Sequence, residues 1–222
     1  MRHHRRTRRT LAAPLAALTL SVGVLALAGC NILAPAFYVI HGPEKVRKLH
    51  ELDPNRPTVV FVDDRANRVP RRALRGTIAR SAEETLLQRR VLRNVIASNS
   101  AVQAVSADRY GSPMPIDEIA RAVEAEVIIY ATVDAFTLSP DGSTVEPAAQ
   151  IRVKVIDAVS GQRVWPEDRN GQAVTIRIPQ RPGYAPSTRN EAAQLEDELA
   201  ARIGVGMAQI FFDHERQASA RR

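Results

Sequence analysis

The fold prediction begins from Val127-Ile128-Ile129-Tyr130-Ala131-Thr132-Val133, which directly follows a segment with helical spacing from residue 116 to residue 125. Its nearly continuous apolar character predicts a central strand covered on both faces, because a strand with one face in water alternates polar and apolar residues. The preceding segment predicts an amphipathic helix, since its apolar residues recur on one helical face at Ile116, Ile119, Ala120 and Val123. A helix that leads into a buried strand indicates a layered α/β domain.

Upstream, Thr58 to Val62 reads as a short buried strand, bounded by Pro57 and by Asp63-Asp64. Pro70 opens a predicted helix, whose apolar face repeats every four residues at Leu74, Ile78, Ala82 and Leu86. The pattern continues less regularly toward Ser98, where we expect a break. The segment from Ala101 to Ala107 fits either a helix or a strand.

Downstream, residues 150–155 and 173–178 alternate in polarity, which predicts strands with one wet face. Between them, residues 157–162 predict a turn and residues 163–165 the start of the returning strand. Thr188 and Glu191 have capping-box spacing before a last helix. Its apolar stripe should pack on the sheet, the alternative being an exposed partner-binding face; the stripe consists of Leu195, Leu199, Ile203, Met207 and Ile210. We therefore predict an α/β fold of the α+β kind, with a single mixed β-sheet, a C-terminal β-hairpin region and flanking amphipathic helices.

The amino terminus has the order of a secretory signal peptide. Five arginines lie between Arg2 and Arg9, and 18 uncharged residues from Leu11 to Ala28 follow. The segment ends in Leu27-Ala28-Gly29-Cys30, which contains the one cysteine of the chain. An uncleaved membrane anchor with an incidental cysteine is the alternative interpretation.

This ending resembles the lipobox of bacterial lipoproteins. The resemblance implies that Cys30 receives diacylglycerol on its thiol, and palmitate or another acyl chain, and becomes the first residue after cleavage. Asn31 follows where an aspartate would retain such a protein in the inner membrane, so we expect an outer-membrane anchor and a domain that faces the periplasm. Thr7-Arg8-Arg9-Thr10-Leu11 also resembles a twin-arginine motif weakly, so the export route stays open between the general secretory and twin-arginine pathways.

We accordingly divide the chain into a signal peptide (1–29), a lipid-anchored lead-in (30–56), a periplasmic α/β domain (57–215) and a polar tail (216–222). The signal peptide holds five of the seven net positive charges, which leaves +2 for the remainder. That near balance argues against nucleic-acid binding, because such domains concentrate basic charge on one face. Arginine outnumbers lysine 28 to 3, which we interpret as a compositional bias.

The search for catalytic motifs is mostly negative. Three histidines follow the signal peptide, His41, His50 and His214, and their spacing does not predict a metal site. No nucleophile elbow, Walker loop or dinucleotide fingerprint occurs, so we expect neither a cofactor nor an enzyme. Asp63 and Asp64 could form a carboxylate site at the strand ends, but we favour the simpler interpretation that they bind loop amides or pair with Arg65 and Arg68. Gly204 and Gly206 lie in a helical pattern, where they predict close packing rather than phosphate binding.

Two segments carry a family resemblance. Glu126 to Val133, followed by Val153 to Trp165, is similar to a group of periplasmic lipoprotein domains that includes the curli-secretion lipoprotein and the peptidoglycan-synthase-activator lipoproteins. The similarity covers roughly residues 57 to 165. It implies a periplasmic binding or assembly module and transfers no functional residue except Cys30. The chain lacks the extra amphipathic hairpins of the curli pore and the long linker of the synthase activators.

Our first hypothesis is an outer-membrane lipoprotein that acts as a non-catalytic binding, assembly or accessory module through partners in the envelope, and that could form a homo-oligomer. The alternatives are a small-ligand binder or hydrolytic enzyme that uses Asp63 and Asp64, and a subunit of an oligomeric secretion pore.

Overall fold

The main sheet of the domain contains six strands in a computed structural model that describes residues 45–107, 114–181 and 183–215. The strand order is β3, β2, β4, β5 and β6, with β7 pairing on β5 beside β6. The strands are β2 (Thr58–Asp63), β3 (Val95–Ile96), β4 (Val127–Thr137), β5 (Ala148–Asp157), β6 (Gln162–Trp165) and β7 (Gln172–Arg177). A separate two-stranded sheet joins β1 (Lys45–Val46) and β8 (His214–Glu215).

The sheet is mixed, as the sequence predicts. Strand β2 runs parallel to β3 and β4, whereas β5 is antiparallel to β4, β6 and β7. The pairing of β2 with β4 extends from Thr58 to Asp63, but its pairing with β3 includes only Thr58 and Val59. Strand β4 carries an irregularity between Val133 and Ala135, beyond which it continues against β5.

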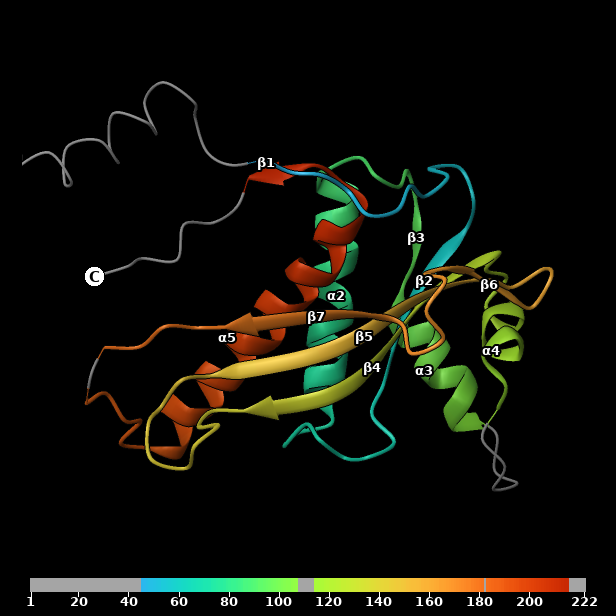
Figure 1. The fold of residues 1–222 in the computed structure, drawn as a ribbon. Helices are drawn as coiled ribbons and strands as arrows, with labels where there is room; N and C mark the ends of the chain where they lie inside the picture. The colour runs from blue at the N-terminus through green and yellow to red at the C-terminus, as the bar shows by residue number, and fades with distance from the viewer. Residues whose placement is uncertain (1–44, 108–113, 182, 216–222) are drawn as a thin grey trace, which may run out of the picture. The chain divides into compact units, whose positions relative to one another are not determined.

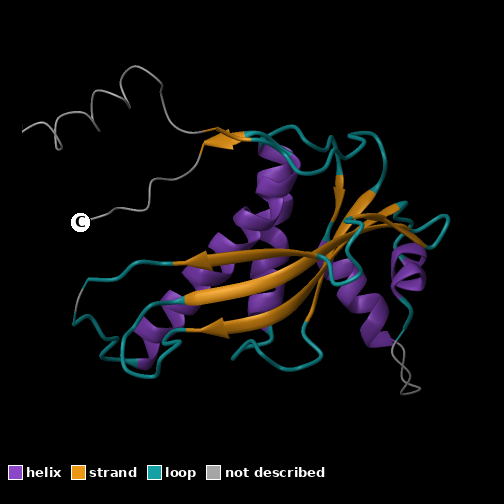
Figure 2. Ribbon diagram, in the orientation of Figure 1, coloured by secondary structure: helices purple, strands orange, loops and turns teal. Residues whose placement is uncertain are grey.

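Helices cover the two faces of the sheet unequally (Figures 1 and 2). Helices α2 (Ala73–Gln88) and α5 (Arg189–Ala208) lie behind β4, β5 and β7 in Figure 1, with the short 3-10 helix η1 (Gln209–Phe211) after α5. Helices α3 (Ser98–Ala107) and α4 (Ile116–Ala122) pack together on the other face, over β2 and the first half of β4. The larger core lies under α2 and α5, where Ile129, Ile151 and Ile203 have no exposed surface.

This arrangement confirms the predicted fold class. The predicted central strand is β4, and Ile128, Ile129 and Ala131 within it are completely buried. The apolar stripe of the last helix is core, because its five residues are at most 8% exposed, and the ambiguous segment from Ala101 to Ala107 is helical. Thr188 caps α5 by accepting a hydrogen bond from the backbone N–H of Glu191 at 3.2 Å.

Two expected helices end earlier than their patterns indicate. Helix α2 stops at Gln88, and the residues that follow form a turn and then β3, a strand that the sequence pattern did not predict. Helix α4 stops at Ala122 rather than continuing to Ala125. In both places a residue other than glycine, Arg90 or Glu124, adopts a positive φ and reverses the chain.

The described part of the lead-in packs against the domain. Leu52 is buried in the larger core, and the N–H of Leu49 donates to the carbonyl of Ile210 at 2.7 Å. His50 stacks on Trp165 with ring centroids 5.5 Å apart, which places that tryptophan at the edge of the core. Within the described residues, none of the helices combines the length and apolar character that a membrane span requires.

Candidate functional site

Asp64 is a structural residue of the loop between β2 and α2. Its carboxylate accepts hydrogen bonds from the backbone N–H groups of Arg68 at 2.7 Å and Val69 at 3.0 Å. The residue is 6% exposed, and its backbone carbonyl accepts from the N–H of Asn67. Since both carboxylate oxygens satisfy loop amides, the contacts of Asp64 are fully explained by loop structure.

Asp63 has different partners, one on the neighbouring strand β4 and one in the loop after β2. Its Oδ2 atom accepts a hydrogen bond from the Tyr130 hydroxyl at 2.7 Å and from Arg65 Nε at 2.8 Å. Burial raises the pKa of Tyr130 well above its ordinary value, and the hydrogen bond to Asp63 and the negative charge of Asp63 raise it further. Tyr130 therefore remains a proton donor to Asp63. The two carboxylates of the sequence-predicted pair thus bind different partners.

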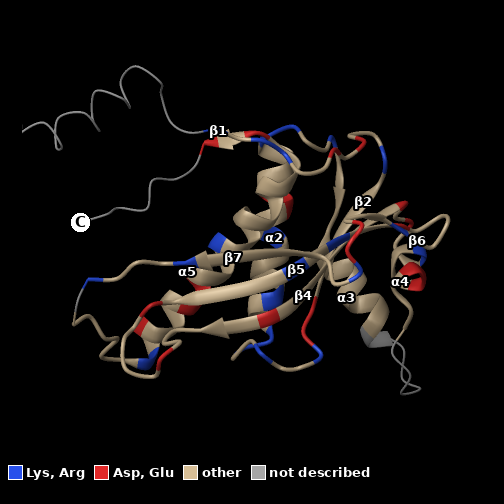
Figure 3. Ribbon diagram, viewed as in Figure 1, with Lys and Arg blue, Asp and Glu red and all other residues tan. Residues whose placement is uncertain are grey.

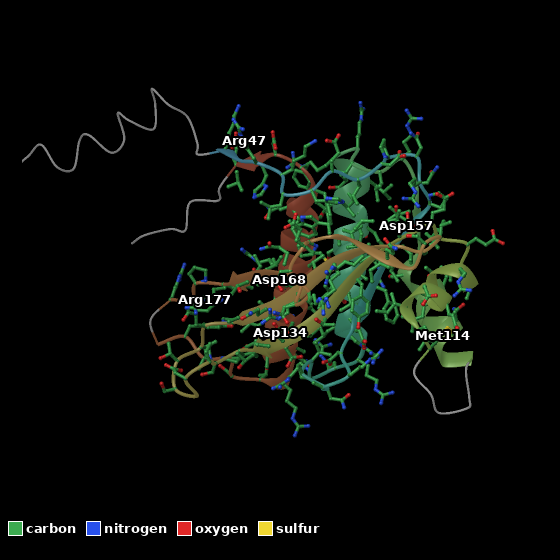
Figure 4. The ribbon with its side chains drawn as sticks, turned by 45° about the vertical axis from the view of Figure 1, so that its right-hand side comes forward. Arg47, Met114, Asp134, Asp157, Asp168 and Arg177 are labelled. Carbon is green, nitrogen blue, oxygen red and sulfur yellow. The ribbon has the colours of Figure 1, made fainter. Side chains whose placement is uncertain are left out.

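Polar side chains also lie on β4 and β5, beyond Asp63 and Tyr130. Asp134 accepts a hydrogen bond from Arg152 Nε at 2.6 Å, while Lys154 pairs with Tyr130 across the strands. Asp134 and Asp157 lie at separate places along the β4–β5 pair (Figure 4), and Asp157 binds Arg56 at the end of β5. The N–H of Ser160 and the guanidinium of Arg56 lower the pKa of Asp157 to about 2. These ion pairs join strands and loops to one another, which is a structural role.

A groove of about 510 Å³ lies between α2 and α3. The β2 strand forms its floor and the two helices form its walls. Its lining residues are Val60, Phe61, Val62, Arg72, Ala73, Arg75, Gly76, Ala79, Arg80, Glu83, Ala97, Ser98, Asn99 and Val102. We call this hollow the α2–α3 groove. Its volume is within the range of common ligand sites.

The floor of the α2–α3 groove includes an unpaired strand edge. Because β3 pairs only with Thr58 and Val59, the same edge of β2 has no strand partner from Val60 to Asp63 among the described residues. Val60, Phe61 and Val62 of this segment line the groove. We call residues 60–63 on that side the free edge of β2. Proteins usually cover such an edge, since its backbone donors and acceptors can pair with another chain.

Small residues on α2 keep the groove open. Ala73, Gly76 and Ala79 line the wall, and a Cβ atom added to Gly76 would meet nothing within 4 Å. Glycine inside a helix costs roughly 0.5–1 kcal/mol relative to alanine. Packing does not require Gly76, because nothing approaches it. Its effect is to leave space above the free edge.

The rim of the groove is basic. Arg72, Arg75 and Arg80 line it, and Figure 3 shows the basic positions along α2. Neither Arg72 nor Arg75 forms an ion pair with a described residue, whereas Arg71 beside them binds Glu196 and Asp197 on α5. The acidic residue of the groove, Glu83, is already engaged. The groove therefore presents positive charge to whatever enters it.

Glu83 holds the beginning of α3 against α2. It is 9% exposed, and its Oε1 atom accepts a hydrogen bond from the backbone N–H of Ser98 at 2.8 Å. Burial raises the pKa of Glu83, while the hydrogen bonds from Ser98 and the charge of Arg80 act in the opposite direction. This contact fixes the distance between the two walls of the groove.

Sequence reasoning did not identify the α2–α3 groove. Its residues come from three elements and share no motif, and the short β3 that leaves the edge unpaired was not predicted. The one available signal was Gly76, a glycine inside a strongly helical pattern. By contrast, Gly204 does serve close packing as expected, since an added Cβ would lie 2.3 Å from the carbonyl oxygen of Ile78 on α2.

The structure describes His50 and His214 among the histidines noted in the sequence. Cys30 and His41 lie outside the described residues, and His50 and His214 make ring contacts with neighbouring aromatic residues. In the described part of the chain, no three histidine, cysteine or acidic side chains come together as a metal site would require.

No family model matches the chain, and no curated protein matches its sequence. Among solved structures, the chain is similar to the PelC dodecamer from Paraburkholderia phytofirmans, with 15% identity, 73% of this chain and 96% of that chain covered, and a TM-score of 0.41. It is also similar to lipoprotein GNA1162 from Neisseria meningitidis (10% identity, 68% and 96% covered, TM-score 0.38). A third similar structure is the LpoB C-terminal domain from Salmonella enterica (15% identity, 58% and 86% covered, TM-score 0.37).

Proposed function

We propose that this protein is a lipid-anchored, non-catalytic binding module of the bacterial envelope, and that the α2–α3 groove is where it holds a partner protein. The groove carries the proposal, because it joins an apolar floor, walls of small residues and a basic rim in one place. The two carboxylates that could have supported hydrolysis are occupied by loop amides in one case and by Tyr130 and Arg65 in the other.

The anchor belongs to the same proposal. Cys30 follows Leu27-Ala28-Gly29, as the modified cysteine of a lipobox does, and two or more acyl chains give stable membrane attachment. Asn31 favours the outer membrane, with the domain in the periplasm. The partner would then be another envelope protein or a second copy of this chain.

Metabolic labelling with palmitate tests the anchor. We expect the wild-type protein to incorporate label and to fractionate with the outer membrane, and Cys30→Ser to lose both properties. Asn31→Asp should keep the label and shift the protein toward the inner membrane. Label on the Cys30→Ser variant would refute the lipid-anchor assignment, and an unshifted Asn31→Asp variant would refute the sorting rule.

Quantitative crosslinking tests the binding function. The acylated protein is recovered from crosslinked, detergent-solubilised envelopes, and its partners are compared with those of Gly76→Leu, which fills the groove. At least one envelope protein, or a second copy of the chain, should be lost from the Gly76→Leu sample. Gln88→Leu is the matched control, because Gln88 is exposed on the same helix and does not line the groove. Identical recoveries from wild type and Gly76→Leu would contradict a binding role of the groove.

A further inference from the structure

We propose that the α2–α3 groove binds an extended, acidic segment of its partner as an added β-strand on the free edge of β2. The inference rests on the proposed function and makes it more specific, since it names the conformation and the charge of the bound segment. It follows from three independent properties of the groove: the backbone of its floor, the space between its walls and the charge of its rim.

The backbone of the floor selects an extended polypeptide. Strand β2 is fully paired with β4 from Thr58 to Asp63 on one side, so it is held rigidly in strand geometry. On the other side its pairing stops at Val59, and four residues of correctly oriented strand continue without a neighbour. At about 3.3 Å per residue, these four residues offer roughly 13 Å of pairing edge. A bound strand completes such an edge with main-chain hydrogen bonds.

The walls provide room for the side chains of the added strand. Alternate side chains of a strand point to opposite faces, so one set would contact α2 and the other α3. On α2 the wall consists of Ala73, Gly76 and Ala79, and the position above Gly76 is open. On α3 the wall presents Asn99 and the 46%-exposed Val102. The α2 side thus accepts large side chains, and the α3 side offers both a polar and an apolar contact.

The rim selects acidic residues. Arg72 is the N-cap of α2 and Arg75 lies in its first turn, after the loop that leaves the C-terminal end of β2. Neither pairs with a described acid, and the carboxylate of Glu83 in the groove already accepts from Ser98. Aspartate or glutamate in the added strand would complement these arginines, and a basic strand would be repelled.

A display selection tests the inference directly. Random eight-residue peptides are selected against the acylated protein in detergent, and the enriched peptides are synthesised with a fluorescent label. We expect enriched sequences to contain an excess of Asp and Glu over Lys and Arg. Binding should weaken at least tenfold to Gly76→Leu and to the double variant Arg72→Gln, Arg75→Gln. The matched control is Arg169→Gln, Arg181→Gln, since both arginines are exposed and lie outside the groove.

Backbone methylation of the peptides distinguishes strand pairing from other modes of binding. Methyl groups on alternate peptide nitrogens remove the donors along one side of a strand only. One of the two alternating sets should therefore reduce affinity at least tenfold, while the other set leaves it within about twofold. The inference is overturned if selection enriches no peptide, if enriched peptides bind Gly76→Leu as well as wild type, or if both methylated sets behave alike.

The experiments distinguish failure of the strand inference from failure of the proposed function. If the peptide experiments fail but the envelope partner is still lost from Gly76→Leu in crosslinking, the groove binds a folded surface rather than an extended strand. If the partner is retained by Gly76→Leu, the binding role of the groove fails, and the strand inference fails with it.

Discussion

Two glycines in helices illustrate how the same residue serves different purposes. Gly204 of α5 faces α2, where a Cβ atom would lie 2.3 Å from the Ile78 carbonyl oxygen and 2.9 Å from Ser81 Cβ. Gly76 of α2 faces the α2–α3 groove, where a Cβ atom would meet nothing within 4 Å. Both glycines lie in helical sequence patterns, and the prediction that Gly204 allows close packing is confirmed. Only the structure shows that Gly76 borders open space.

Alanine at the two positions should therefore have opposite effects. Gly204→Ala forces the helices apart and should lower the free energy of unfolding by about 1–3 kcal/mol. Gly76→Ala removes a flexible residue from a helix without a clash, and should raise it by about 0.5–1 kcal/mol. Urea unfolding followed by circular dichroism measures both. Destabilisation by Gly76→Ala would show that this position is packed rather than open.

The buried carboxyl of Glu83 should make stability depend on pH. Its pKa is raised in the folded state by burial, so the folded protein holds the proton more tightly than the unfolded chain. As pH rises from about 4.5 through the raised pKa, the wild type loses this contribution to stability. Glu83→Gln keeps an oxygen that can accept from the Ser98 N–H, yet it does not titrate.

The stability of Glu83→Gln relative to wild type should consequently increase between pH 4 and pH 7. The groups that face Glu83, namely Arg80, Glu84 and Ser98, are the same in both proteins. Urea unfolding at the two pH values gives the difference. Glu167→Gln is the control, because its side chain is exposed and is not among the groups that act on Glu83, so it should produce no such increase. A constant or falling difference for Glu83→Gln would contradict the effect of burial.

Most elements were predictable, because their patterns are local. The alternation in β5 and β7, the apolar run in β4 and the four-residue repeat in α2 each specify an element without tertiary information. Helix ends were less predictable, since Arg90 and Glu124 adopt a positive φ that sequence rules assign to glycine. The two-residue β3 was not predicted, because two residues show no periodicity and pair only through the tertiary fold.

The capping residues at the start of α5 are a local sequence signal whose contribution to the free energy of unfolding can be measured. Thr188 accepts a hydrogen bond from the Glu191 N–H, and Glu191 Oε2 accepts from the Ser187 N–H at 2.6 Å. Thr188→Ala should lower the free energy of unfolding by about 1 kcal/mol. Ser187→Ala, which keeps its backbone N–H, should change it by less than half as much. Equal effects of the two substitutions in urea unfolding would refute the assignment of Thr188 as the cap.

At the scale of the molecule, local sequence patterns predict the fold, but they do not predict the candidate site. The α2–α3 groove depends on where β3 stops, on how α3 is held by Glu83, and on which face of α2 is left uncovered. None of these is encoded in a contiguous motif. The candidate carboxylates from the sequence, Asp63 and Asp64, lie at the end of β2, where they bind residues of the loop that follows and Tyr130.

Site-specific photocrosslinking in living cells tests the binding claim most directly. A photoreactive amino acid is placed at Asn99, on the α3 wall of the groove, and in a second strain at Thr175, which is exposed on β7. We predict an ultraviolet-dependent adduct with an envelope protein, or with a second copy of this chain, from Asn99 and a yield at least tenfold lower from Thr175. No adduct from Asn99, or equal yields from the two positions, would contradict the assignment of the α2–α3 groove as the partner-binding site.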